Sequence, residues 1–406
     1  MKSMKIVVVG CGAVGSLVAR LAAKWKVADE VLCLDKDVER AKRYLDYPEP
    51  LGIPVERADA LAAEELKAKV AGYDFLVNSL PTFVKVDKAE RLLNPQLMSV
   101  ALKAGLNYAD LACYGGKRRR AEQLSFSKAF SEAGLLALIN MGASPGLSNI
   151  LAREVYEDLD SAESLYVMSL EDQRGSSFVI PWSREEMLNV ASPELCFRGR
   201  KYSLREPFSE SALCNFPEPI GPVRCYSVSN DEAYTIPAFL RISNFYYLAG
   251  GSDIEVLRAL YRLGILSDVP VKLRKATVTP RELLYHILPP TPSPEYIVRV
   301  VKEGDLEDAY FALQVYAEGE VRGERAVSKR YLVFPSQRRV NELMPGATYI
   351  TYPTALSLLA VLSAVKGRRL RGVVPGEALP GPIRRAVLDY LRVQGITVGE
   401  EFRTVA

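Results

Sequence analysis

The first 35 residues constrain the fold more than any other part of the chain. Ile6 to Val9 form an unbroken apolar run, as expected of a strand buried on both faces of a parallel sheet. A glycine-rich turn, Gly10-Cys-Gly-Ala-Val-Gly15, follows at once, and Ser16 to Trp25 has the composition of a helix. A second apolar run, Val31 to Leu34, ends in Asp35. Strand, turn, helix and strand in this order predict the start of a doubly wound α/β sheet.

Each glycine of the turn has a physical role in holding a dinucleotide. Gly10 permits the tight turn, Gly12 lets the backbone approach a pyrophosphate, and Gly15 lets the helix pack closely on the strand. The phosphates would lie on the free N–H groups at the start of the helix. Asp35 follows Gly15 by 20 positions, where an acid can accept hydrogen bonds from a ribose. The stretch therefore predicts a nicotinamide dinucleotide site.

The charges around Asp35 bear on which dinucleotide binds. Its carboxylate would bond the ribose of NAD and repel the 2′-phosphate of NADP. Lys36, Arg40 or Arg43 could instead pair with that phosphate. We expect NAD, with NADP as the alternative. Asp59 follows the next predicted strand and would either meet the adenine amino group or cap a loop.

Strands and helices alternate up to about residue 150. Predicted strands at 53–56, 74–78, 107–111 and 135–139 are separated by predicted helices, among them 38–44, 62–70 and 122–133. Such alternation is typical of a Rossmann-type parallel sheet, in which ligands bind at the carboxyl ends of the strands. We expect residues 1–150 to form the dinucleotide-binding domain.

The pattern changes beyond residue 150. Short β-rich runs at 164–169, 309–316 and 329–334, with helices at 253–263 and 280–288, predict an inserted α+β substrate domain over 151–346. Helical patterns return at 354–366 and 383–394. We expect residues 347–406 to pack back against the first domain.

Composition excludes several classes of function. With 25% charged residues, 49% hydrophobic residues and a net charge of +3, the 406-residue chain gives no reason to expect nucleic acid or a membrane as a partner. The first five residues leave no room for a signal peptide before the first strand, and no apolar run reaches the ~18 residues of a membrane span. The six cysteines include no CxxC pair. We expect a cytoplasmic protein.

The chain has one histidine, His286. We therefore expect neither a histidine-based zinc site nor a Ser-His-Asp hydrolase, and no metal. His286 lies in an amphipathic pattern, Arg281 to Leu288, as a packed or surface residue of a helix would. Acid–base chemistry should then use carboxylates, tyrosine, cysteine or lysine.

Five motifs, in this order, resemble the saccharopine dehydrogenase-like family, which includes saccharopine reductases, carboxynorspermidine dehydrogenases and lysine 6-dehydrogenases. They are Gly10–Gly15, Asn107-Tyr-Ala-Asp-Leu111, Met141-Gly-Ala-Ser-Pro-Gly-Leu-Ser-Asn149, Asn230-Asp-Glu-Ala-Tyr-Thr-Ile-Pro237, and Thr348–Ala360 with Gly372-Val-Val-Pro-Gly-Glu377. The family usually has Asp where this chain has Ser144, and many members have His at the position of Asn230. The resemblance implies the same domain order, with a substrate and dimerisation domain inserted after the dinucleotide domain.

The resemblance also implies an activity. The expected protein is an NAD(P)-dependent oxidoreductase acting on a C–N bond of an amino acid-derived secondary amine or imine, and a homodimer. Saccharopine-type condensation or cleavage leads within the family, and oxidative deamination of the lysine side chain is the alternative. The residues at 144 and 230 motivate a hypothesis of another class, a dinucleotide-binding sensor or subunit without catalytic activity.

Candidate site residues follow the predicted strand ends. Asn78, Ser79, Leu80, Pro81 and Thr82 follow the fourth strand, where the cofactor ribose and substrate meet in such folds; the alternative is an ordinary proline turn. Tyr108 and Asp110 lie two apart and can point to one face, which the resemblance places near the nicotinamide and the substrate amine. Alternatively, Tyr108 is a core residue and Asp110 a helix cap.

Other candidates come from the later motifs. Ser144 and Pro145 fit an N-cap and the first turn of a helix, and the resemblance implies that this helix start borders the substrate. It also implies that Asp231 and Glu232 contact the substrate amine, whereas an acid pair in a loop is usually solvated. Arginine side chains could clamp substrate carboxylates, and Arg174, Arg184 and Arg224 are unranked candidates.

The expected roles are as follows. Catalysis would use Asp110, Glu232 and Tyr108. The cofactor would contact Gly10, Gly12, Ala13, Val14, Gly15, Asp35, Asp59, Asn78, Ser79 and Leu80. The substrate would contact Pro81, Thr82, Ser144, Pro145, Asp231 and Arg224.

Overall fold

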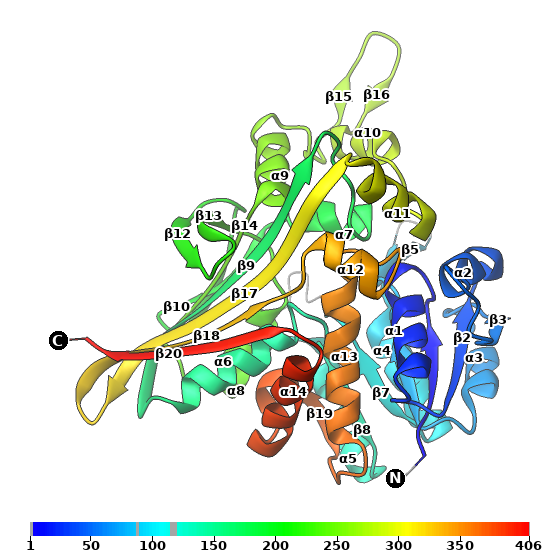
Figure 1. Ribbon diagram of the computed structural model, residues 1–406, viewed down its shortest axis with the longest axis horizontal. Helices are drawn as coiled ribbons and strands as arrows, with labels where there is room; N and C mark the ends of the chain where they lie inside the picture. The colour runs from blue at the N-terminus through cyan, green and yellow to red at the C-terminus, as the bar shows by residue number, and fades with distance from the viewer. Residues whose placement is uncertain (1–2, 87–88, 114–119, 406) are drawn as a thin grey trace.

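The computed structural model describes residues 3–86, 89–113 and 120–405 (Figure 1). Seven parallel strands form the first sheet, in the order β19-β8-β7-β4-β1-β2-β3. Their bounds are β1 (Lys5–Val9), β2 (Glu30–Asp35), β3 (Val55–Arg57), β4 (Phe75–Asn78), β7 (Asn107–Asp110), β8 (Leu136–Ile139) and β19 (Gly372–Pro375). The Rossmann-type sheet predicted from the sequence is confirmed.

Apolar side chains lie on both faces of this sheet, as expected of a parallel sheet that is covered on both sides. Ile6 and Val8 belong to one core cluster, and Val7 and Val9 belong to another. The helices around the sheet are α1 (Ala13–Lys24), α2 (Val38–Leu45), α3 (Ala63–Val70), α4 (Leu93–Ala104) and α5 (Ser127–Glu132), with the short η1 (Glu122–Phe126). A hairpin of β5 (Phe83–Val86) and β6 (Ala89–Leu92) precedes α4 and was not predicted.

The strand register brings three candidate residues to one edge. Val9 pairs with Asn78, and Asn78 pairs with Asp110, so the carboxyl ends of β1, β4 and β7 lie level. The strand order reverses at β1, and ligands bind at such a switch point in open α/β sheets. The glycine-rich turn follows β1 directly.

A second sheet of nine strands lies beside the first domain (Figure 1). Its main path is β11-β10-β14-β9-β17-β18-β20, and the β12–β13 hairpin joins at β14. The bounds are β9 (Ser161–Gly175), β10 (Glu194–Arg198), β11 (Lys201–Arg205), β12 (Ser211–Phe216), β13 (Gly221–Ser227), β14 (Asn244–Gly250), β17 (Leu306–Val321), β18 (Glu324–Val333) and β20 (Thr397–Thr404).

Helices and a small hairpin complete this part of the molecule. They are α6 (Leu147–Glu157), α7 (Arg184–Asn189), η2 (Glu232–Tyr234), α8 (Ile236–Phe239), α9 (Ser252–Arg262), β15 (Val271–Lys272), β16 (Thr277–Val278), α10 (Pro280–Ile287), α11 (Pro294–Glu303) and α12 (Gln337–Leu343). Alternate residues of β17 face opposite sides, so Leu313 and Val315 join the main core while Ala312 and Tyr316 face away from it.

The C-terminal segment contributes to both sheets. Helix α13 (Thr351–Val365) packs against α1 and α14 (Gly381–Val393), and β19 extends the first sheet beyond β8. The short η3 (Gly376–Ala378) follows β19. Strand β20 then pairs with β18 in the second sheet, a connection that the sequence did not predict. The last 50 or so residues thus tie the two parts of the molecule together.

Gly15→Ala should destabilise the first domain, because a Cβ there would overlap the carbonyl oxygen of Gly10. Overpacking against backbone of this kind costs about 2 kcal/mol or more. Gly12→Ala is the matched control, since a Cβ at Gly12 would meet no atom within 4 Å. Urea denaturation followed by circular dichroism measures both, and an equal loss of stability in the two variants would contradict this packing argument.

Candidate active site

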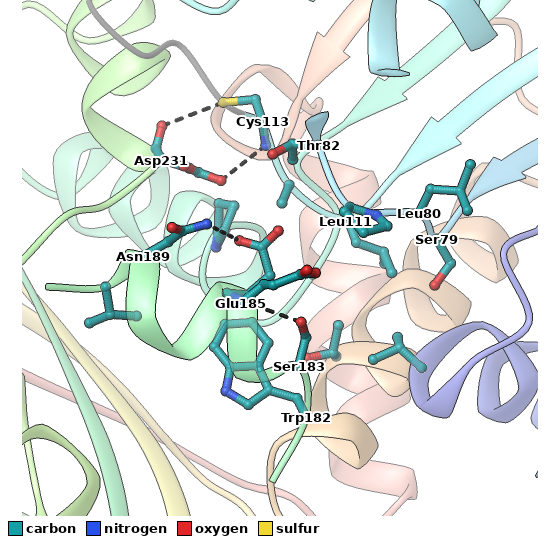
Figure 2. Close-up of a pocket in the computed structure, with 18 of the residues that line it drawn as sticks. Ser79, Leu80, Thr82, Leu111, Cys113, Trp182, Ser183, Glu185, Asn189 and Asp231 are labelled. Carbon is teal, nitrogen blue, oxygen red and sulfur yellow. Dashed lines mark hydrogen bonds between the residues drawn. The ribbon is translucent and has the colours of Figure 1, made fainter. Parts of the chain in front are cut away.

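A cavity of about 770 Å³ is lined by residues from both parts of the molecule. Figure 2 shows Ser79, Leu80 and Leu111 of the first domain facing Trp182, Ser183 and Glu185 at the start of α7. Sixteen of the residues predicted from the sequence line this cavity. They are Gly10, Gly12, Ala13, Val14, Gly15, Asp35, Asn78, Ser79, Leu80, Pro81, Thr82, Asp110, Ser144, Pro145, Asp231 and Glu232. The remaining three, Asp59, Tyr108 and Arg224, do not. The roles of all of them stay predictions.

The glycine-rich turn has the shape that a pyrophosphate needs. Gly10 has a positive φ of 89°, and the position of Gly12 is open beside the cavity. Helix α1 has no side-chain cap and no acidic residue in its first turn, so its first N–H groups are available to an anion. The turn and the helix start therefore fit the diphosphate of a dinucleotide.

Asp35 is 4% exposed and lies at the end of the cavity beside the glycine-rich turn. Its carboxylate accepts hydrogen bonds from the backbone N–H groups of Cys11 at 2.7 Å and Asp37 at 2.9 Å. The exposed Arg40 lies 3.4 Å from it. Tyr44 lines this end as well, and its hydroxyl donates to the carbonyl oxygen of Pro292. The proline-rich stretch of residues 289–294 thus contacts α2 at this end of the cavity.

Asp110 is 1% exposed and accepts hydrogen bonds from four donors. The donors are the Tyr108 hydroxyl at 3.0 Å, the side chains of Asn94 at 3.0 Å and Gln123 at 3.2 Å, and the backbone N–H of Asn140 at 2.7 Å. Burial raises the pKa of Asp110 to about 6 against these bonds. These four hydrogen bonds hold Asp110 and the residues around the end of β7 in place.

Tyr108 lies behind Asp110 and is completely buried. Its hydroxyl accepts from the Asn78 side chain at 3.0 Å and donates to Asp110. The structure therefore gives it the core position that was the alternative prediction, and its contact with the cavity is indirect. Asn94, which the sequence did not single out, lines the cavity in its place, and its Oδ1 has no hydrogen-bond partner among the described residues.

Glu232 is 1% exposed and joins the two parts of the site. Its Oε1 accepts hydrogen bonds from the hydroxyls of Ser144 and Ser148, each at 2.6 Å. Ser144 also lies 3.0 Å from the hydroxyl of Tyr247, which donates to Ser169 on β9. Burial raises the pKa of Glu232. The result is a buried carboxylate at one end of a chain of hydroxyls.

The predicted N-cap role of Ser144 is wrong. Helix α6 begins at Leu147, its N-cap is Gly146, and the side chain of Asn149 accepts from the N–H of Gly146 at 2.9 Å. A Cβ at Gly146 would overlap the backbone of Gly142, so the turn requires glycine there. Ser144 is thereby left free to bond Glu232. Nothing in the local sequence distinguishes these two uses of a serine before proline.

Asp231 contacts the first domain, as Figure 2 shows. Its Oδ2 accepts from the backbone N–H of Cys113 at 3.0 Å. Burial, with the charges of Glu232 and Glu186, raises its pKa well above the ordinary value. Neither member of the predicted acid pair is a solvated loop residue. Asn230, in contrast, is structural, because its Oδ1 accepts from the N–H of Ala233 at 3.0 Å.

Of the remaining candidates, Asp59 and Arg224 lie outside the cavity. Asp59 is exposed and accepts from the N–H of Leu61 at 2.9 Å, so it caps a loop. Arg224 is exposed on β13. Arg184 lines the cavity instead, with its guanidinium 3.9 Å above the ring of Tyr285 and a hydrogen bond to the carbonyl oxygen of Leu288. His286 lies exposed on α10, as expected.

Two features are absent from the part of the chain that the structure describes. No group of three or more His, Cys, Asp and Glu side chains is arranged to hold a metal ion. None of the described helices combines the length and hydropathy that crossing a membrane requires.

Residues 6–138 match the family described as the saccharopine dehydrogenase NADP binding domain. The first part of the chain is thus similar to the saccharopine dehydrogenase-like family. The resemblance drawn from the five motifs is confirmed, and so is the prediction of a nicotinamide dinucleotide as cofactor. The family description names NADP, and a similar structure was solved with NAD.

The similar proteins include a synthase and a dehydrogenase. Over 304 residues, 70% of this chain and 73% of the relative, the sequence is 20% identical to a carboxynorspermidine synthase from Vibrio cholerae. It is 25% identical over 308 residues, 70% of this chain and 72% of the relative, to a carboxyaminopropylagmatine dehydrogenase from Synechocystis.

Two solved structures share the fold. Saccharopine dehydrogenase (L-Glu forming) from Saccharomyces cerevisiae has a TM-score of 0.65 and 13% identity, and each chain is covered completely. A homospermidine synthase from Legionella pneumophila, in complex with NAD, has a TM-score of 0.62 and 14% identity over 99% of this chain and 92% of the other.

Stability should fall between pH 5 and pH 8, partly through Glu377. This carboxyl of η3 is completely buried; its Oε2 accepts from Asn149, and burial raises its pKa from 4.5 to about 7. Above pH 4.5 the unfolded chain releases this proton while the folded protein retains it, so the free energy of unfolding decreases until the pH passes about 7.

Glu377→Gln should reduce this loss by on the order of 2 kcal/mol. The groups that face Glu377 are Asn149 of α6, Glu232 of η2 and Thr235, which follows η2. The variant leaves all three unchanged. Urea denaturation at pH 5 and pH 8 measures the difference. Parallel losses in variant and wild type would show that Glu377 does not titrate in this range.

Proposed function

We propose that this protein is an NAD(P)-dependent oxidoreductase that acts on a C–N bond of an amino acid-derived secondary amine or imine. The observation that carries this proposal is that the glycine-rich turn and the Glu232 hydroxyl chain line one cavity. A nicotinamide bound there would supply the exchange of a hydride. The names of the curated relatives, which include an amine dehydrogenase, support the same class of reaction.

The protein would first hold the cofactor. The N–H groups at the start of α1 would bind the diphosphate, and Asp35 would accept hydrogen bonds from the adenosine ribose. We favour NAD because Asp35 is buried at that position, and Arg40 keeps NADP as the alternative. Asn78 and its neighbours in the turn after β4 would direct the nicotinamide end toward the substrate.

Glu232 is the proposed proton acceptor. An alkylammonium must lose its N–H proton before its carbon can give up a hydride, so the site needs a base beside the amine. Burial raises the pKa of Glu232 above that of an ordinary glutamate, and so brings it closer to neutral pH. Ser144 and Tyr247 connect this carboxyl to Ser169 and hold it in place. Because Glu232 lines the cavity, it can pass the proton to water once the product has left. Asp110 and Tyr108 act as positioning residues.

Glu232→Gln should lower kcat by about 10²- to 10⁴-fold, the usual contribution of a general base. It should leave the affinity for the dinucleotide within twofold, because Glu232 lies at the substrate end. The assay follows the absorbance of the reduced nicotinamide with NAD⁺ or NADP⁺ and a panel of saccharopine, lysine and carboxyalkylated diamines. A variant with the kcat of the wild type would remove Glu232 from the reaction.

Two arginines provide a matched test of substrate binding. Arg184→Ala should raise the KM for a carboxylate-bearing amine by about 10- to 100-fold, because a charge-assisted contact is lost. Arg224→Ala should leave KM unchanged, since Arg224 is exposed outside the cavity. The reverse result would place the substrate carboxylate elsewhere.

The hypothesis of a catalytically inactive sensor or subunit has a specific observation behind it. Asn230 stands where many family members have histidine, and its side chain accepts a hydrogen bond from the backbone of Ala233 in η2, so it supplies no acid or base. Tight dinucleotide binding with no reduction by any amine of the panel would favour this second function. Failure to bind either dinucleotide would overturn both.

The assembly and compartment that the sequence suggests remain proposals. A second copy would cover the sheet face opposite α6, where Tyr166 stacks between Tyr246 and Tyr316 at centroid distances of 4.5 and 4.4 Å. The six cysteines are free and buried, which fits the reducing conditions of the cytoplasm.

A further inference from the structure

Glu171 is a carboxylate in the cavity that the proposed chemistry does not use. It lies on β9 and lines the cavity together with Tyr247 and Ala249 of β14. It has no hydrogen-bond or ion-pair partner within the part of the chain that the structure describes. Glu171 is half-buried and faces the cavity, whereas the carboxylates of Asp110 and Glu232 each accept two or more hydrogen bonds from neighbouring residues.

The alternation of β9 places Glu171 between two satisfied residues. Ser169, Glu171 and Gln173 point to one face of the strand. Ser169 accepts from Tyr247 at 3.2 Å, at the end of the hydroxyl chain that leads to Glu232. Gln173 donates to Asp253 at 2.8 Å and to Tyr349 at 3.1 Å. Glu171 therefore lies one strand repeat, about 7 Å, beyond Ser169 along β9.

Folding alone does not favour a glutamate at this position. Burial and the nearby charge of Asp253 on α9 raise the pKa of Glu171 to about 8, so the folded protein disfavours its ionised form. Tyr247 and Tyr349, the other titratable groups nearby, bring no positive charge. A neutral side chain would remove this electrostatic cost. A cation that enters the cavity would also remove it.

The charges of the cavity point to the nature of that cation. Besides Glu171, the carboxylates of Glu186, Asp231 and Glu232 line the substrate end, whereas Arg184 is the one cationic side chain among the described residues lining that end. One arginine side chain can bind one carboxylate group of a ligand. The excess of carboxylates favours a ligand with more than one cationic nitrogen.

We propose that Glu171 binds a distal ammonium group of the substrate and thereby selects amines that carry a second cationic nitrogen a short alkyl chain away from the reacting one. This inference rests on the proposed function, in which the reacting nitrogen lies at Glu232. Glu171 takes no part in the hydride or proton transfer. Its role is to set specificity.

The test compares two substrates that differ only in the distal group. One is a carboxyalkylated diamine, and the other is the same molecule with a methyl group in place of the distal ammonium. Glu171→Gln should lower kcat/KM for the first substrate by about 10- to 100-fold, the usual effect of losing a hydrogen bond to a charged group. It should leave kcat/KM for the second unchanged.

A control variant separates specific binding from the general charge of the cavity. Glu185 also lines the cavity but is exposed and bonded to the Tyr285 hydroxyl at 2.8 Å. Glu185→Gln removes the same charge and should leave the ratio of the two kcat/KM values unchanged. The thermal midpoint of Glu171→Gln should be no lower than that of the wild type. An equal effect of Glu171→Gln on both substrates, or none on either, would overturn the inference while the proposed oxidoreductase stands.

Direct binding provides a test that does not require turnover. Calorimetry would compare 1,4-diaminobutane and butylamine as ligands of the full-length protein with bound dinucleotide. The diamine should bind more tightly to the wild type, and Glu171→Gln should remove this preference. Such a result without oxidation of any amine would support the cation site and refute the proposed reaction. An unchanged preference would overturn the cation site.

Discussion

The oxygen Oε1 of Glu232 accepts two serine hydroxyls at 2.6 Å, and these serines lie just before and within the first turn of α6. Glu232 itself belongs to the region inserted after the first domain. A carboxylate this deeply buried must be hydrogen-bonded or neutral, so these bonds require the inserted region to sit against the edge of the Rossmann-type sheet. The cavity exists because the two parts of the molecule meet at this carboxylate.

A second buried carboxylate fixes the other side of the same cavity. Asp110 accepts four hydrogen bonds at the end of β7, and through Tyr108 and Asn78 it connects to the end of β4. The turn after β4 is thereby held level with the glycine-rich turn after β1. The surroundings of the two acids suit them to different roles. Asp110 accepts hydrogen bonds from four donors, whereas Glu232 lies at the end of a chain of hydroxyls that can exchange protons. Only the second arrangement suits proton transfer.

The sequence predicted those features that depend on local rules. The glycines, the apolar strand of residues 6–9 and Asp35 each obey a rule of backbone geometry or strand burial, and the sheet and dinucleotide site followed from them. The resemblance extended the site to Ser144, Asp231 and Glu232. Local rules failed where a long-range contact decides the outcome. Ser144 looks like a helix cap but bonds Glu232, 88 positions away.

Other features could not be predicted from the sequence for the same reason. Arg184 and Arg224 are indistinguishable by type, and only the packing of α7 against Tyr285 brings Arg184 into the cavity. Strand β20 joins the second sheet because β18 offers it an edge, which no pattern within residues 397–404 indicates. Glu171 was overlooked because an acid in the long strand β9 carries no motif. Its distinguishing property is the lack of a partner, which becomes visible only in three dimensions.

In the proposed reaction, a hydride passes directly between a nicotinamide and the carbon next to the substrate nitrogen inside this cavity. The most direct test uses an amine deuterated at that carbon, with NMR of the reduced dinucleotide after turnover. We expect one deuterium at C4 of the nicotinamide, on a single face, because the cavity would hold the substrate on one side of the ring. Reduced dinucleotide without deuterium would contradict the account.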